Sequence, residues 1–326
     1  ITDGLVYAIT VLSSVIIART LGPEFFGLWA LILTSLGYIE AFGRPKTDAA
    51  SIYVIGSGKK STEICIAINN LITAASMLPL SVIIFYLVYF SKHQIDDIAN
   101  IDINYLALLC IMFTCVQFFN LNYKYIIIAK GNFTCLNKTK ITQSLTFFLI
   151  SCFGLYFFSN YFYILLFATI IAAFSSLIIG YSGTGIKPFF PEKPSQRDLL
   201  DLIKRGRFFY VSNIIVELQS SIGKFGAVFF LPLEKVGYLA LSTTLIAFTL
   251  KVSEAVNIVL MPKISAMRED DGINFLGLVI RQMIIISLVI TCFLCFLSDY
   301  FIVLMYSKDF KPAVLIFQIL LVGLCF

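Results

Sequence analysis

Long apolar stretches alternate with short clusters of charged residues along the whole chain. A helix rises about 1.5 Å per residue, so about 20 residues cross the roughly 30 Å of hydrocarbon in a bilayer. Most of the stretches approach that length, and together they predict ten membrane-spanning helices. The ten stretches are residues 4–18, 25–42, 64–90, 105–123, 141–159, 161–180, 208–231, 236–261, 275–297 and 313–326.

The last of these stretches is too short for a full span. As a helix, residues 313–326 would measure about 21 Å, which is less than the thickness of the hydrocarbon. The sequence also begins without a methionine and without the charged segment and cleavage site of a signal peptide. We therefore expect a piece of a longer chain, shortened slightly at its beginning and substantially at its end.

Composition agrees with a membrane protein. The 326 residues are 59% hydrophobic and 13% charged, whereas a soluble domain carries about 25% charged residues. The net charge of +5 is spread over the loops and forms no single basic face. These values exclude a soluble domain, a disordered chain and a nucleic-acid-binding protein, and they predict an all-α polytopic membrane protein.

The positions of the basic residues predict the topology. Seventeen Lys and Arg residues lie in one alternating set of connections and five in the other, and the remaining two, Lys224 and Lys251, fall inside predicted helices. Because basic loops stay on the cytoplasmic side, we expect the N-terminus to be cytoplasmic.

A proline-rich connection divides the chain. Pro188, Pro191 and Pro194 precede a charged segment whose leucines have helical spacing, as in a linker followed by a short interfacial helix. We therefore expect residues 1–190 to form an N-terminal lobe of six spanning helices. Residues 191–207 would be the cytoplasmic linker, and residues 208–326 a partial C-terminal lobe with four further helices.

An internal repeat supports two related lobes. Residues 21–31 and 231–241 share Leu, Glu, Gly, Ala and Leu at five of eleven positions with a constant offset of 210. Each copy joins the first and second helix of its half. An offset of six helices keeps both copies on the same side of the membrane, so the repeat is parallel, as in several transporters.

Polar residues form stripes inside the predicted spans. A charge at the centre of a spanning helix costs about 2.5–3.5 kcal/mol and usually marks an aqueous path or a binding site. The stripes are Gly37, Glu40 and Arg44; Asn69, Thr73 and Ser76; Thr114, Gln117, Asn120 and Lys124; Asn213, Glu217, Ser220 and Lys224; and Thr244, Lys251, Glu254 and Asn257. Their spacing places each set on one helix face.

These stripes have two interpretations. The residues can pair across packed helices, for example Lys224 with Glu217 or Lys251 with Glu254. Buried ion pairs are poor stabilisers, however, and stripes in both halves favour a shared hydrophilic cavity. For a single pair both interpretations stay open.

Signals of an enzyme or a metal site are scarce. The C-x-x-C of Cys292 and Cys295 lies in an apolar run, and His93, the one histidine, lies in a polar loop. Thiolates that bind metals or react need a polar, accessible setting. The chain contains no H-E-x-x-H, G-x-S-x-G, Walker loop or G-x-G-x-x-G. We expect no catalytic residue, no metal and no cofactor.

Three sets of motifs follow one another along the chain. Residues 17–31 have the sequence IARTLGPEFFGLWAL. The second set is RFFYVSN at 207–213, then Lys224, EKVGYLA at 234–240 and MPKIS at 261–265. The third is LMY at 304–306 with FKPA at 310–313. In family order, these motifs resemble those of Wzx-type polysaccharide flippases, the polysaccharide transporter branch of the MOP flippase superfamily.

The resemblance implies a fold of two six-helix lobes around a cavity that opens to either side in turn. It implies an undecaprenyl-pyrophosphate-linked oligosaccharide as substrate, an O-antigen or capsule repeat unit moved from the inner to the outer leaflet of a bacterial inner membrane. Other polysaccharide-assembly proteins would be partners, and H⁺ or Na⁺ the coupling ion. Arg19, Arg44 and Lys224 match basic positions of the family. Gly223 stands where members often carry an acid, a role that Glu217 could take.

We therefore predict three groups of site residues. Cations for the diphosphate are Arg19, Arg44, Lys224 and Lys251; candidates for ion coupling are Glu40, Glu217 and Glu254; polar cavity residues are Asn213, Ser220, Gln117 and Asn257. The main alternative is a cation-coupled multidrug or metabolite antiporter of the same superfamily. A membrane-embedded glycan polymerase or transferase is the third possibility.

Overall fold

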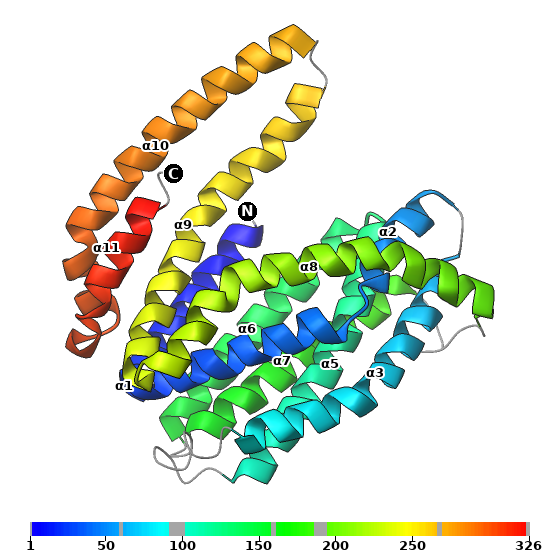
Figure 1. Ribbon diagram of the computed structural model, residues 1–326, viewed down its shortest axis with the longest axis horizontal. Coiled ribbons are helices and arrows are strands. Elements are labelled where there is room, and N and C mark those ends of the chain that lie inside the picture. Colours follow the sequence, from blue (N-terminus) through cyan, green and yellow to red (C-terminus); the bar gives the residue numbers. More distant parts are fainter. Residues whose placement is uncertain are drawn as a thin grey trace. The chain divides into compact units, whose positions relative to one another are not determined.

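A computed structural model describes residues 2–58, 61–90, 102–157, 161–185, 194–265 and 269–323, and in these residues all regular structure is helical (Figure 1). The helices are α1 (Thr2–Gly43), α2 (Thr47–Gly56), α3 (Thr62–Phe90), α5 (Ile103–Ala129), α6 (Phe133–Phe157), α7 (Tyr161–Thr184), α8 (Gln196–Phe230), α9 (Leu233–Ser265), α10 (Glu269–Met305), the 3₁₀ turn η1 (Lys308–Phe310) and α11 (Ala313–Gly323).

The chain is a multi-pass membrane protein. In its described part, seven helices are long and apolar enough to cross a bilayer: α1, α3, α5, α6, α7, α9 and α10. Each predicted span overlaps a helix, and α1 contains the first two of them. The seventh and tenth predicted spans overlap α8 and α11, which are not among these seven helices. Inside α1, Gly22 has a left-handed backbone (φ 72°, ψ 174°) and Pro23 follows it, so the chain changes direction there (Figure 1).

Contacts divide the chain into two compact units. The first unit comprises Ile1–Ser14 and Ile32–Phe225, and the second comprises Val15–Leu31 and Gly226–Phe326. The expected lobes, residues 1–190 and 208–326, stay predictions, but the expected short interfacial helix is not separate: α8 runs without a break from Gln196 to Phe230. The reason is tertiary packing: the first turns of α8 pack into the first unit, and the middle of α1 packs into the second.

The core of the first unit shows how α8 is held. Leu202 of α8 is fully buried in a cluster formed with α2, α3 and α5, and Leu199 packs against it. The other buried members are Ala50, Val54, Cys65, Ile66, Ile68, Tyr123 and Ile126. Full burial of a leucine side chain stabilises a fold by about 1.5–3 kcal/mol, so the amphipathic start of α8 is anchored to this unit.

In the second unit, α1 and α9 approach each other closely. A Cβ atom on Gly27 would lie 2.2 Å from the carbonyl oxygen of Leu233, and one on Gly237 would lie 2.0 Å from the carbonyl oxygen of Pro23. Both pairs, Gly27 with Gly237 and Pro23 with Leu233, are equivalent positions of the sequence repeat. The contact is therefore reciprocal, as in an interface between elements related by a two-fold axis.

Aromatic residues pack beside this contact between α1 and α9. The Phe310 ring meets the Phe26 ring edge-on at a centroid distance of 5.9 Å, and the Tyr238 ring lies 6.2 Å away. Phe310 is completely buried. Thus parts of all three motif sets that carry the family resemblance pack against one another, which gives them a structural role.

Candidate functional site

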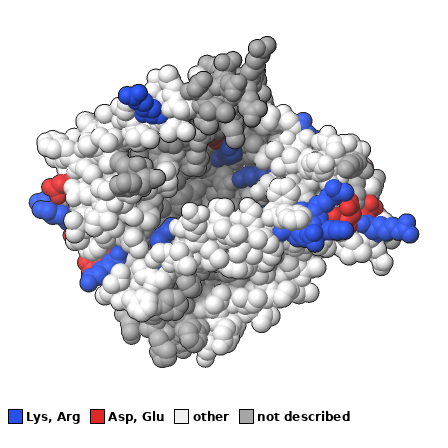
Figure 2. All heavy atoms as spheres, turned by 45° about the horizontal axis from the view of Figure 1, so that its top comes forward, with Lys and Arg blue, Asp and Glu red and all other residues white. Residues whose placement is uncertain are grey.

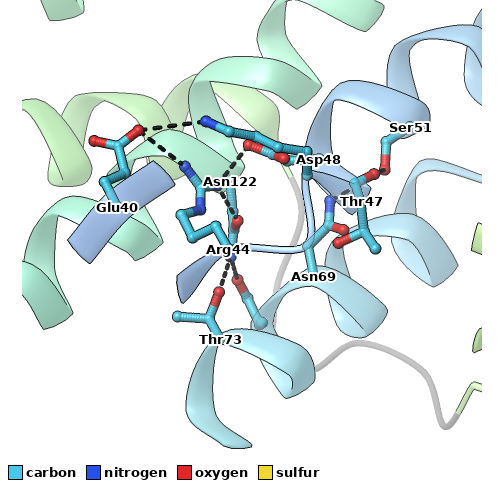
Figure 3. A network of polar contacts seen from close by, with 10 residues as sticks. Glu40, Arg44, Thr47, Asp48, Ser51, Asn69, Thr73 and Asn122 are labelled. Carbon is cyan, nitrogen blue, oxygen red and sulfur yellow. Dashed lines mark hydrogen bonds and ion pairs between the residues drawn. The ribbon is translucent and has the colours of Figure 1, made fainter. Parts of the chain in front are cut away.

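The end of α1 carries a buried polar network centred on Arg44 (Figure 3). Arg44 is 4% exposed. Its Nη2 atom lies 2.5 Å from Oδ2 of Asp48 and donates to Oδ1 of Asn122 at 3.0 Å. Its Nη1 atom lies 3.8 Å from Oε1 of Glu40, and its guanidinium lies 5.3 Å from the centroid of the Phe118 ring.

Asparagine and hydroxyl side chains extend this network across three helices. Asn122 of α5 donates to Oδ1 of Asn70 at 3.1 Å and to Oγ1 of Thr73 at 2.9 Å, both on α3. Asn69 donates to Oγ of Ser51 on α2 at 3.1 Å. The network therefore ties α1, α2, α3 and α5 together at one place in the first unit.

Glu40 also belongs to this network. Its Oε1 atom lies 3.5 Å from Nζ of Lys46, which has a left-handed backbone (φ 52°) between α1 and α2. Arg44 and Glu40, predicted to bind substrate and a coupling ion, thus have protein partners. Removing one member of a buried ion pair costs about 3–5 kcal/mol, so we assign Arg44 a structural role in this conformation.

The polar stripe of α8 faces the second half of α1. A Cβ atom on Gly37 would lie 3.0 Å from Oε1 of Glu217. That same oxygen accepts a hydrogen bond from Ser221 at 2.7 Å, and Ser220 donates to the carbonyl oxygen of Glu217 at 3.1 Å. Glycine at position 37 therefore provides the space into which the carboxylate fits.

Lys224, at the end of this stripe, is partly buried. Among the described residues it has no partner within ion-pair distance, and neither has Glu217. The pairing of Lys224 with Glu217 that the sequence left open is not formed. In the described part of the chain, neither charge is neutralised by an ion pair, and Asn213 lies one turn before Glu217 on the same helix.

The stripe of α5 is partly satisfied within the first unit. Asn120 is fully buried and accepts a hydrogen bond from Ser176 of α7 at 3.0 Å. Oε1 of Gln117 is buried without a hydrogen-bond partner in the described part of the chain. Gln117 thus remains a polar position that the protein itself does not satisfy.

Arg19, predicted to bind substrate, lies in the second unit. Its Nε atom donates to the carbonyl oxygen of Met305 at 2.7 Å, and its Nη2 atom donates to that of Leu304. Met305 is the last residue of α10. The guanidinium therefore caps the negative end of that helix, a partner that no local sequence pattern indicates.

Three predicted residues cannot be placed in the site. Lys251, Glu254 and Asn257 lie in α9, but their side chains fall outside the described residues. Their roles stay predictions. Conversely, sequence reasoning missed Asp48 and Asn122, although a carboxylate four residues after Arg44 and a second asparagine in an apolar span were visible signals.

Among the comparisons with known proteins, only the one with solved structures gives a match, and it identifies the fold. No family model and no curated protein match the chain. Among solved structures, it is similar to a mutant of the Vibrio cholerae MATE transporter VcmN, with a TM-score of 0.63 and 17% sequence identity, over 98% of this chain and 77% of that one. This likeness confirms the expected fold class: the chain shares the all-α, polytopic fold of that MATE transporter.

Proposed function

We propose that this chain is a transporter that moves a lipid-linked oligosaccharide diphosphate from the inner to the outer leaflet of a bacterial inner membrane by alternating access. It performs no covalent chemistry. The fold shared with a transporter supports the transport class, and the flippase motifs support the substrate class.

The setting of Lys224 is the observation on which the proposed substrate class rests. It is a partly buried ammonium group in α8 without an ion-pair or hydrogen-bond partner among the described residues. Moving an unpaired charge out of water is costly, and charge-assisted hydrogen bonds to phosphate are among the strongest that a lysine makes. A diphosphate would supply the missing partner.

Four carboxylates of the first unit do not fill that role, and Glu217, although its charge acts on Lys224, forms no ion pair with it among the described residues. Asp3, Glu40, Asp48 and Asp201 each lie within 4 Å of a basic side chain other than Lys224. The positive charge on α8 is therefore not used by these acids. This arrangement suits an anionic substrate better than a cationic one.

We further propose that the N-terminus is cytoplasmic. Figure 2 shows charged side chains of both signs gathered over the first turns of α8. Residues 196–207 hold four basic and two acidic residues, and basic excess marks the cytoplasmic side. Leu202 anchors this segment in the first unit, which would place that end of the unit at the inner leaflet.

A second candidate function rests on Glu217. This carboxylate has only the hydroxyl of Ser221 as a described side-chain hydrogen-bond partner, so it could bind H⁺ or Na⁺. In a flippase it would couple transport to an ion gradient. In a multidrug or metabolite antiporter it would bind the cationic substrate itself.

The test is complementation in a bacterium that carries the gene. We expect lipid-linked repeat units to accumulate and surface glycan to fall when the gene is deleted. Wild type and Lys224→Arg should restore both, Lys224→Ala should restore neither, and Lys235→Ala, an exposed control, should behave as wild type. Surface glycan that is untouched by the deletion would contradict the flippase proposal and favour the antiporter.

A further inference from the structure

Lys124 lies just beyond the predicted span 105–123 but within the candidate spanning helix α5, and its setting differs from that of the other basic residues. It lies five residues before the end of α5, about 7.5 Å along the helix axis. Its Nζ atom donates to Oε1 of Gln143 on α6 at 2.6 Å. Within the described residues this neutral amide is the partner of the ammonium group, and no carboxylate lies within 4 Å.

The nearby acids make their ion pairs with other basic side chains. Glu40 accepts Lys46 and lies near Arg44, while Asp3 lies 2.8 Å from Nζ of Lys140. An ammonium group has three donors, and Lys124 uses one of them. Two charged N–H groups in a spanning helix are thus left for something outside the described protein.

The residues on the helix faces around Lys124 favour binding of an anion. On α6, Lys140 and Gln143 are three residues apart and share a face, and Lys140 forms an exposed ion pair with Asp3 at 2.8 Å. An exposed ion pair of this kind contributes little to stability, so Asp3 does not prevent Lys140 from contacting a more highly charged anion. On α5, Gln117 lies two turns from Lys124 on the same stripe, and its buried Oε1 atom accepts no hydrogen bond in the described part of the chain.

We infer that Lys124, Gln143 and Lys140 form an anion-binding subsite within the first unit, which takes the oxyanion of a phosphate group. Lys124 and the amide N–H₂ of Gln143 would donate to the phosphate oxygens, and Gln117 would accept from a hydroxyl about two helix turns away. The inference rests on the proposed function for its assignment of the phosphate to a lipid-linked saccharide; a phospholipid headgroup offers the same chemistry.

The subsite would lie where such a substrate enters. The connection between α5 and α6 belongs to the predicted cytoplasmic set of loops, and Lys124 lies near the end of α5 that leads into it. A diphosphate at the inner leaflet would meet this subsite at the headgroup level, without first crossing the hydrocarbon.

Binding of inorganic pyrophosphate to the purified full chain tests this inference. In nanodiscs of phosphatidylcholine, we expect pyrophosphate to raise the Tm of wild type in a saturable way. Lys124→Gln should weaken the apparent affinity at least tenfold. Lys138→Gln, an exposed position on α6, is the matched control and should stay within twofold of wild type.

Gln143→Glu separates binding from a structural role. The new carboxylate would pair with Lys124, so a merely structural lysine would be held as well or better and the Tm without ligand would not fall. An anion-binding lysine would be neutralised, and the pyrophosphate effect should drop at least tenfold. Retention of the effect in Gln143→Glu, or its absence from wild type in every lipid, would overturn the inference.

Changing the lipid composition of the nanodisc distinguishes the two possible sources of the phosphate. If phosphatidylglycerol in the nanodisc leaves the pyrophosphate affinity of wild type unchanged, the subsite serves a substrate. If phosphatidylglycerol competes and the competition is lost in Lys124→Gln, the subsite holds a lipid headgroup. Because this assay measures binding, its failure would leave the transport proposal standing, and a failed complementation would leave the anion subsite standing.

Discussion

The reciprocal contact between Gly27 and Gly237 makes a quantitative prediction about stability. In Gly27→Ala the new Cβ atom would lie 2.2 Å from the oxygen of Leu233 and 2.9 Å from the nitrogen of Gly237. Both neighbours are backbone atoms, so no side-chain rotation relieves the clash and α1 and α9 must separate. Overpacking of this kind costs about 1–3 kcal/mol, and we expect that loss in the free energy of unfolding.

Gly237→Ala should cost a similar amount, because its Cβ atom would lie 2.0 Å from the oxygen of Pro23. The double variant should cost less than the sum of the two, since separation of the helices by one methyl group makes room for the other. Denaturant unfolding of the purified chain in detergent measures all three variants.

Gly277→Ala is the matched control. This glycine lies in α10, and a Cβ atom there would meet nothing within 4 Å. Alanine is favoured over glycine in a helix by about 0.8–1 kcal/mol, so the control should be neutral or more stable. If Gly27→Ala unfolds like Gly277→Ala, or if the two contact variants are strictly additive, the reciprocal contact is refuted.

Two further predictions concern the basic residues that the structure assigns to packing. Arg44→Met leaves the Asp48 carboxylate buried without its partner and should lower the free energy of unfolding by about 3–5 kcal/mol, whereas the double variant with Asp48→Asn should lose less; additive losses in the unfolding assay would argue against the pair. Arg19→Gln removes the charge at the end of α10 and should cost about 0.3–1 kcal/mol with surface glycan retained; loss of glycan at unchanged stability would instead indicate that Arg19 contacts substrate.

The spans and the repeat could be predicted because they are local patterns. The equivalence of Gly27 and Gly237 is visible as a constant offset in the sequence, and the structure adds that the two copies contact each other. The stripe of Glu217 and Lys224 follows from helical spacing, and both side chains occupy one helix in the first unit. Helical periodicity shows which residues share a helix face, and this local information was sufficient to predict the spans and the polar stripe.

The division into units and the partners of the cations depend on contacts between distant segments. The start of α8 joins the first unit through Leu202, and Arg19 caps a helix end that lies 286 residues away in sequence. No propensity or charge pattern encodes such pairings. The sequence likewise could not distinguish Arg44, which has buried partners, from Lys224, which has no ion-pair partner among the described residues. Each is simply the basic residue at the end of a polar stripe.

Reconstituted transport tests the central claim most directly. The full-length protein in proteoliposomes, supplied with a fluorescent undecaprenyl-diphosphate oligosaccharide, should make the inner-leaflet label accessible to an added membrane-impermeant quencher, with and without an ion gradient. We predict transport by wild type and Lys224→Arg, and none by Lys224→Ala. Equal accessibility with wild type, with Lys224→Ala and with empty liposomes would contradict the account.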